Sequence, residues 1–135
     1  MSEDPTVRGV AIYPDKRVED VTVTGLAEMQ AIVDGNIEAV ELSDGSTMYV
    51  DEEYLYNKPR DAINSIAMDV CGLGGVPHLM FSGILGPVLV LGPVDDEGWN
   101  TDVTDKARKW IRRVGREAGM QPASWGLASA DTDAG

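Results

Sequence analysis

"GLAEMQAIVDGNIEAVEL", residues 25–42, decides the fold class because its hydrophobic period changes halfway along. The first part repeats apolar residues at helical spacing: Leu26, Met29, Ile32 and Val33. Thr24 can cap the N-terminus of this helix, and Gly35 suits the left-handed residue that follows its last turn. Residues 36–42 then show the composition of a strand. The stretch therefore predicts a helix over 25–35 that leads directly into a strand.

Further strands are predicted on both sides of this helix–strand unit. Residues 6–14 and 17–24 are rich in β-branched side chains, and a short turn joins them. The valine spacing slips at Glu19–Asp20, which predicts a β-bulge or an irregular second strand. On the other side, an Asp-Gly turn at 43–46 leads to a strand over 47–50. The first half of the chain thus has the order β-β-α-β-β.

The second half alternates helix and strand once more. Residues 60–72 space their apolar side chains for a helix that starts near Pro59. The apolar run 84–94 predicts a buried strand, with Pro87 at its start or at a sheet edge. Residues 103–119 form an amphipathic helix, whose apolar stripe is Ala107, Trp110, Ile111, Val114 and Ala118.

Together these elements predict a single α+β domain over residues 1–119. We expect a mixed or antiparallel sheet of about five strands with three helices. A chain of 135 residues is the usual size of one domain. Residues 120–135, rich in Ser, Gly, Ala and Asp, are expected to form a flexible C-terminal tail.

The composition also predicts the cellular compartment. Cys71 is the single cysteine, so no internal disulfide forms, as in proteins of a reducing cytosol. No charged N-terminal region precedes an apolar core, and the longest apolar run is too short to cross a bilayer. We therefore expect a cytoplasmic protein with no membrane contact.

Charge is distributed unevenly along the chain. The net charge is −12, yet residues 104–119 hold six of the eleven basic residues. The remaining, strongly acidic part repels nucleic-acid phosphates. We therefore expect nucleic-acid contact, if there is any, only through residues 104–119.

The acidic run Asp51-Glu52-Glu53 raises the question of a catalytic or metal-binding cluster. Consecutive strand residues point to opposite faces, so three neighbouring acids do not converge on one ion unless the backbone turns. The alternating oxygen ligands and central glycine of a calcium loop are absent. We interpret the run as a solvated turn, in which Glu52 or Glu53 could pair with Lys58 or Arg60.

The glycine-rich segment 72–83 contains the only histidine, His78. Its glycines follow a predicted helix instead of a strand and lack a phosphate-loop lysine, which favours a helix end over a nucleotide loop. A flexible lid over a ligand is the alternative.

One histidine and one cysteine exclude the usual zinc ligand sets. A Cys71–His78 or Ser82–His78 nucleophile pair can be drawn, but no third group supports it, so we expect no metal, no cofactor and no catalytic residue.

The basic face of the helix at 103–119 is the strongest localised feature. A solvated face whose cations pair with the acidic body is the simpler interpretation, and a surface for an anion or an acidic partner is the alternative. The candidate ligand- or partner-binding residues are Arg60, Gly74, Gly75, His78, Lys109, Arg112, Arg113 and Arg116.

Three segments together resemble a known but uncharacterised family. They are "LAEMQAIVDGNIEAVEL" (26–42), "MYVDEEYLYNKPRDA" (48–62) and "SGILGPVLVLG" (82–92). Their order and spacing are similar to those of small proteins, encoded largely by bacteriophages and mobile elements, that carry a domain of unknown function. The resemblance implies an accessory protein in an infected or element-bearing cell and transfers no catalytic residue.

The leading hypothesis is therefore a small non-enzymatic accessory protein that binds a host or phage protein, or another copy of itself as a homodimer. Surface complementarity alone is sufficient for this role. One alternative is a binder that sequesters a nucleotide or another anionic ligand. Another is an acidic DNA mimic, and an enzyme is the least favoured class.

Overall fold

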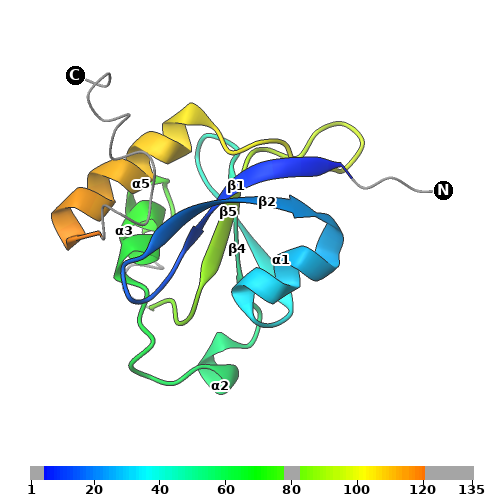
Figure 1. The fold of residues 1–135 in the computed structure, drawn as a ribbon. Helices are drawn as coiled ribbons and strands as arrows, with labels where there is room; N and C mark the ends of the chain where they lie inside the picture. The colour runs from blue at the N-terminus through cyan, green and yellow to red at the C-terminus, as the bar shows by residue number, and fades with distance from the viewer. Residues whose placement is uncertain (1–4, 78–82, 121–135) are drawn as a thin grey trace.

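The computed structural model describes residues 5–77 and 83–120, and Figure 1 shows a sheet with helices on both of its faces. The strands are β1 (Thr6–Ile12), β2 (Val18–Thr24), β3 (Ile37–Glu41), β4 (Thr47–Asp51) and β5 (Val88–Leu91). Every pairing is antiparallel, in the order β2-β1-β5-β4-β3. The helices in the described ranges are α1 (Gly25–Val33), α2 (Tyr54–Asn57), α3 (Ser65–Leu73) and α5 (Asp105–Ala118). The predicted single α+β domain with five strands is confirmed.

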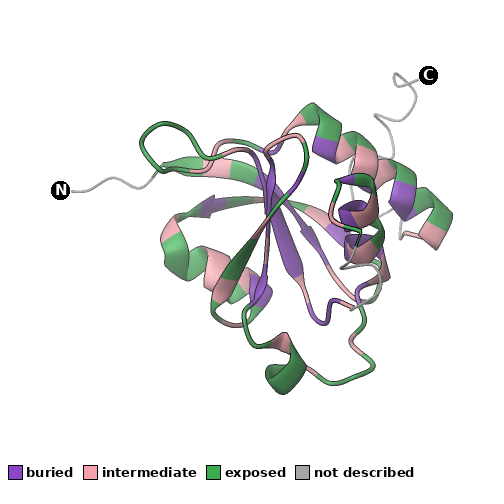
Figure 2. Cartoon of the chain, turned by 180° about the vertical axis from the view of Figure 1, so that it is seen from behind, coloured by how far each residue is buried: buried purple, intermediate pink, exposed green. Residues whose placement is uncertain are grey.

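One face of the sheet, which we call the closed face, packs against α3 and α5. Ile66 and Val70 of α3 and Ile111 of α5 are buried here. Their strand partners are Val10, Ile12, Val18, Met48, Val50, Val88 and Val90, all of them buried. Figure 2 shows this continuous buried region through the middle of the molecule. This face holds the larger of the two hydrophobic clusters and is the main core.

Of the helices in the described ranges, α1 alone packs on the opposite face, which we call the open face. Val33 of α1 is buried against Val23, Leu89 and Leu91. β5 is therefore buried on both faces, because its even-numbered residues point to the closed face and its odd-numbered residues to the open face. A central strand of this kind explains the uninterrupted apolar run, and Pro87 stands directly before it, as predicted.

The valine spacing in β2 has a different cause from the predicted bulge. The β1–β2 register is continuous from Thr6↔Thr24 to Ile12↔Val18. Val18 packs on the closed face, whereas Val21 and Val23 pack on the open face. The predicted bulge was wrong, because the slip in sequence reflects a strand that buries residues on both sides of the sheet.

The ends of α1 also differ from the prediction. The side chain of Thr24 makes no capping hydrogen bond, and its hydroxyl pairs with that of Thr6 at 2.6 Å. The left-handed residue after the helix is Asp34, with φ 60°, and not Gly35. Gly35 is required for another reason. A Cβ at this position would lie 2.6 Å from the carboxyl carbon of Asp51.

The segment between β4 and β5 folds differently from the predicted helix over 60–72. Residues 54–57 form the short helix α2, and α3 begins only at Ser65. Asn64 determines this start, since its side chain accepts the N–H of Ala67 at 3.1 Å. The buried Asn64 amide also donates to the carbonyl oxygens of Ile12 and Gly86, both at 2.9 Å. One side chain therefore caps α3 and connects it to β1.

Among the described residues, none of the helices combines the length and apolar character that a bilayer crossing requires.

Candidate functional site

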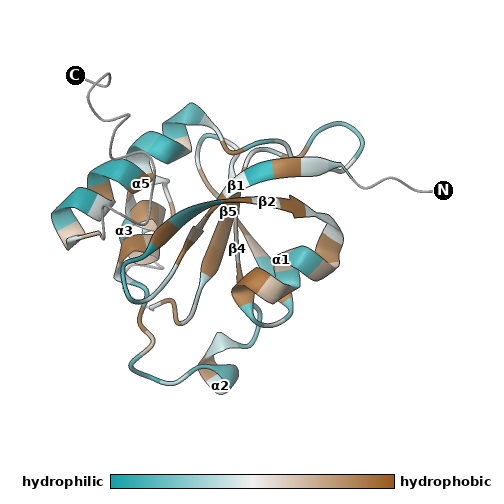
Figure 3. Ribbon diagram, viewed as in Figure 1, coloured by the Kyte–Doolittle hydropathy of each residue, from teal (hydrophilic) through white to brown (hydrophobic). Residues whose placement is uncertain are grey.

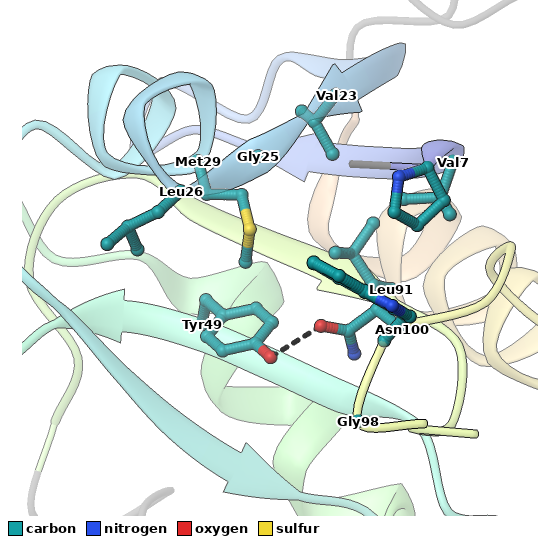
Figure 4. Close-up of a pocket in the computed structure, with 11 residues that line it drawn as sticks. Val7, Val23, Gly25, Leu26, Met29, Tyr49, Leu91, Gly98 and Asn100 are labelled. Atoms are coloured by element: carbon teal, nitrogen blue, oxygen red, sulfur yellow. Dashed lines mark hydrogen bonds between the residues drawn. The ribbon is translucent and has the colours of Figure 1, made fainter. Parts of the chain in front are cut away.

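An apolar pocket lies on the open face beside α1 (Figure 4). α1 has only nine residues and leaves part of this face uncovered. The pocket has a volume of about 190 Å³. Its described lining comes from five separate segments of the chain: Pro5, Val7, Val23, Gly25, Leu26, Met29, Tyr49, Leu91, Gly98, Trp99 and Asn100.

The floor and walls of the pocket are strand and helix side chains of the smaller hydrophobic cluster. Leu91 and Val23 are buried and form its rigid base. Figure 4 shows the Met29 side chain pointing toward the Tyr49 ring. Leu26, in the first turn of α1, keeps 54% of its surface exposed. An exposed leucine thus extends the buried apolar base to the surface of the molecule.

The loop after β5 positions Trp99 beside the pocket. Asp95 organises this loop, because its Oδ1 accepts the N–H groups of Glu97 and Trp99, both at 2.9 Å. The Asp95 N–H in turn donates to the Trp99 carbonyl at 2.7 Å. Trp99 remains 39% exposed. A large aromatic side chain is thus held in place without being buried.

One polar pair interrupts the apolar lining. The Tyr49 hydroxyl donates to Oδ1 of Asn100 at 2.6 Å, and the Asn100 amide donates to the Gly92 carbonyl at 3.1 Å. Burial raises the pKa of Tyr49 above its ordinary value, although the hydrogen bond to Asn100 opposes this shift. The hydroxyl therefore stays protonated at neutral pH and is already satisfied. No carboxylate, amine or imidazole belongs to the described lining of the pocket.

The sequence prediction missed this pocket. Val7, Val23 and Leu91 belong to predicted strands, and Met29 belongs to the apolar stripe of the predicted helix, so none of them stood out as a candidate binding residue. Leu26 shares the apolar stripe of α1 with buried Val33, and only the structure shows that it is half exposed. A pocket lined by such residues can be recognised only when the structure shows how much of the open face α1 covers.

The predicted basic residues belong to α5, on the other side of the sheet. Lys109, Arg113 and Arg116 are exposed, and Arg112 is partly exposed. Figure 3 shows the hydrophilic outer surface of this helix. One cation of α5 does pair with the acidic body, since Arg108 lies 2.9 Å from the carboxylate of Asp20. None of these residues lines the apolar pocket.

The other predicted site residues are also separate from the pocket. Gly74 is buried, and its carbonyl accepts the N–H of Ser43 at 2.7 Å, so it docks the end of α3 on the β3–β4 turn. Gly75 follows with φ 84°, a conformation that favours glycine. Arg60 is exposed between α2 and α3. His78 lies outside the described residues.

The acidic run at 51–53 contains a buried residue, contrary to the predicted solvated turn. Asp51 ends β4 and is only 1% exposed, whereas Glu52 and Glu53 are exposed. Lys58 Nζ lies 3.0 Å from the Asp51 carboxylate, and its side chain is 7% exposed. The Glu53 N–H donates to Asp51 at 2.9 Å, and the Asn57 amide donates to it at 3.2 Å.

Hydrogen bonding controls the charge state of Asp51. Burial alone would raise the pKa of its carboxyl group, but hydrogen bonds from the Glu53 N–H, Lys58 and Asn57 lower the pKa below its ordinary value. Lys58 also donates to the Asp34 carbonyl at the end of α1. The cluster therefore joins α1, β4 and α2, and it leaves no open position for a reacting group.

The residues that could hold a metal or act as a nucleophile are not arranged for it in the described part of the chain. Within residues 5–77 and 83–120, no group of three or more His, Cys, Asp or Glu side chains could hold a metal ion. Cys71 is fully buried, and burial raises the pKa of its thiol to about 12. The partners drawn for it, His78 and Ser82, lie outside the described residues.

Comparison with known proteins places most of the chain in one family. Residues 7–115 match the family model described as "Domain of unknown function (DUF3846)". No curated protein and no solved structure gives a significant match. The match agrees with the expected uncharacterised family.

Proposed function

The chain belongs to the DUF3846 family, and we propose that it is a small, non-enzymatic accessory protein of phage or mobile-element type that binds a partner protein. The apolar pocket receives one aromatic or large aliphatic side chain of this partner. The observation that carries the proposal is an open pocket of about 190 Å³ with an apolar base.

Size supports a single anchoring side chain. Small-molecule sites usually occupy about 300–1,000 Å³, whereas a dry cavity of about 150 Å³ takes a benzene ring. The volume of about 190 Å³ thus fits one ring and is small for a nucleotide. Aromatic anchors in such pockets typically supply most of the binding energy of a protein interface.

Charge indicates which partner fits. The loop beside the pocket carries Asp95, Asp96 and Glu97, all exposed, and the chain has a net charge of −12. A partner whose anchor residue is flanked by lysines or arginines would therefore be attracted and oriented. The described pocket lining has no cation for a phosphate group, which disfavours the nucleotide alternative at this site.

The test places the photo-crosslinker p-benzoylphenylalanine at position 99 and exposes the protein to a lysate of cells that carry it. Leu26→Asp introduces a charge at the pocket, and Leu55→Asp introduces the same charge on α2, where Leu55 is 70% exposed. We expect one dominant crosslinked partner. Leu26→Asp should lower the yield of this crosslink at least about tenfold, because a buried anchor contributes more than about 2 kcal/mol.

The control variant Leu55→Asp shows whether loss of the crosslink is specific to the pocket. Leu55→Asp should leave the crosslink unchanged, and both variants should keep the melting temperature of the parent. Equal crosslinking in the Leu26→Asp and parent proteins would contradict a role of the pocket in partner binding.

A further inference from the structure

The sheet has two edge strands, β2 and β3, and they are covered differently. At the β2 edge, the Thr24 N–H donates to the Glu28 carboxylate at 2.8 Å. Arg108 of α5 reaches Asp20 of the same strand. Natural proteins protect sheet edges with charges and with covering elements of this kind. β2 is thus a protected edge.

The hydrogen-bond phase of β3 shows which of its groups face outward. The Glu52 N–H donates to the Asn36 carbonyl at 2.7 Å, and the Leu42 N–H donates to the Ser46 carbonyl at 2.8 Å. Both pairs continue the β3–β4 register, in which bonded and non-bonded pairs alternate. Even-numbered residues of β3 therefore bond β4, while Ile37, Ala39 and Glu41 direct their N–H and C=O groups away from it.

These outward groups have no hydrogen-bond partner within the described residues. β3 is also flanked by a hollow on each face, and Ala39 and Glu41 line both hollows. The open-face hollow continues over Tyr49, Pro93 and Val94, and the closed-face hollow over Val50, Tyr54, Val76 and Ile84. Such an edge has room for the alternating side chains of an added strand.

Charge selects the occupant of this edge. Residues 36–53 contain six acidic residues and no basic one, and Glu38 and Glu41 of β3 are exposed. A second copy of this chain would place acidic residues of two β3 strands in one ladder, and like charges across strands are destabilising. Lysine or arginine on the added strand would instead pair with Glu38 and Glu41.

We propose that β3 is a docking edge for an extended, basic segment of another protein, which pairs with the outward N–H and C=O groups of Ile37, Ala39 and Glu41. Small or β-branched residues of the segment enter the two hollows, and its basic residues lie beside the glutamates. This interaction does not depend on the apolar pocket, since its main contacts are the outward backbone groups of β3, and Tyr49 is the one described residue that lines both the pocket and the open-face hollow.

The probe is a display library of random peptides of about ten residues, roughly twice the length of β3. The target is the full chain, and selection is repeated against Ala39→Pro. Proline removes one outward N–H and is tolerated at an edge position of this kind. Ala39→Val is the matched control, because it changes the side chain and keeps the N–H group.

We expect the selected peptides to carry basic residues about three positions apart, which reach Glu38 and Glu41 on opposite faces of the sheet, with small or β-branched residues between them. We also expect them to protect the amides of Ile37, Ala39 and Glu41 from hydrogen exchange. Ala39→Pro should weaken their binding at least about tenfold, while Ala39→Val should change it less than about threefold. Methylating alternate peptide nitrogens should abolish binding, and added salt should weaken it.

Three results would overturn the inference. One is a selection that yields no enriched peptides, or acidic ones. Another is equal binding of peptides to the parent and Ala39→Pro, both still folded by their melting temperatures. The third is concentration-dependent dimerisation that Ala39→Pro abolishes, which would assign the edge to a second copy. Crosslinking from position 99 tests the pocket separately, so failure at the edge leaves that proposal unaffected.

Discussion

The two faces of the sheet differ in how completely helices cover them. On the closed face, α3 and α5 together bury an uninterrupted set of strand residues, and Val10, Ile12, Val88 and Val90 have no exposed surface. On the open face, α1 covers one part and leaves the apolar pocket at another. Figure 2 shows how much of α1 stays partly or fully exposed.

We propose that the closed face provides the stability of the domain and that the open face binds a partner. A domain needs one well-packed core to fold, and close packing there leaves no room for a ligand. The second face tolerates an incomplete cover, provided that a few contacts anchor its helix. Here the Asp51–Lys58 cluster provides such an anchor at the end of α1. The uncovered part of the same face forms the apolar pocket in which we propose that a partner side chain binds.

The largest expected difference between the faces is in thiol reactivity. Cys71 lies fully buried under the closed face, and burial raises the pKa of its thiol to about 12. Because the thiolate is the reactive form, alkylation at about pH 8 should be at least roughly a thousandfold slower than for an ordinary thiol. Intact-mass measurement of iodoacetamide labelling checks this, with Leu26→Cys in a Cys71→Ala background as the open-face reference.

Comparable labelling of the two thiols in the folded protein would mean that the closed face opens readily. In that case the proposed contrast between a stable face and a binding face would not hold. Labelling of Cys71 in denaturant should recover the ordinary rate, which shows that the thiol itself is intact.

The next largest difference is expected in the free energy of unfolding when one apolar side chain on each face is truncated to alanine. Ile111 is fully buried, so Ile111→Ala should lower the free energy of unfolding by about 2–5 kcal/mol. Leu26 is half exposed beside the pocket, and Leu26→Ala should change the free energy of unfolding by no more than about 0.5 kcal/mol. Urea denaturation measures both values, and similar losses for the two variants would contradict the assignment of the main core.

The strands and the three longer helices could be predicted from sequence because each depends on a local period. Val18, Val21 and Val23 mark the limit of that reasoning, since residues buried on both faces give the same pattern as a bulge. The start of α3 was misplaced for a related reason. Its position depends on Asn64, whose partners Ile12 and Gly86 are distant in the chain.

The candidate sites were harder to predict than the fold. Asp51 stands beside Glu52 and Glu53 with the same charge, and only the tertiary position of Lys58 distinguishes it. Gly35 was explained by helix capping, but its real constraint is the Asp51 carboxylate. The pocket joins residues from β1, β2, α1, β4, β5 and the loop after β5, so no single window of sequence contains it.

The anchor of the open face should also be measurable. Lys58→Met keeps an aliphatic stem over Gly86 and removes the ammonium group, with its ion pair to Asp51 and its hydrogen bond to the Asp34 carbonyl. It leaves Asp51 buried without its cation, so the free energy of unfolding should fall by about 3 kcal/mol. Arg8→Met, which removes an exposed pair with Asp102, should cost less than about 1 kcal/mol. Equal losses in chemical denaturation would show that the Asp51–Lys58 pair is not an anchor.

The smallest expected effect is the acid dependence of this anchor. The pKa of Asp51 is lowered in the folded protein, so its unfolded form binds a proton at higher pH than its folded form. Its contribution to stability is therefore complete above the unfolded pKa of about 3.9 and is lost as pH falls through the folded pKa. Asp44 has a lowered pKa as well, because hydrogen bonds from Thr104 and Ser46 outweigh the opposite effect of burial.

Comparison of the parent with Asp51→Asn isolates the first group, since Asp44 titrates in both proteins. The parent should be the more stable at neutral pH, and the two unfolding free energies should converge as the pH falls below about 4. Denaturation curves at a series of pH values measure this convergence. A difference that stays constant across the acid range would mean that the Asp51 carboxylate is not held in its charged form by Lys58, Asn57 and the Glu53 N–H, and the open face would then be anchored by packing alone.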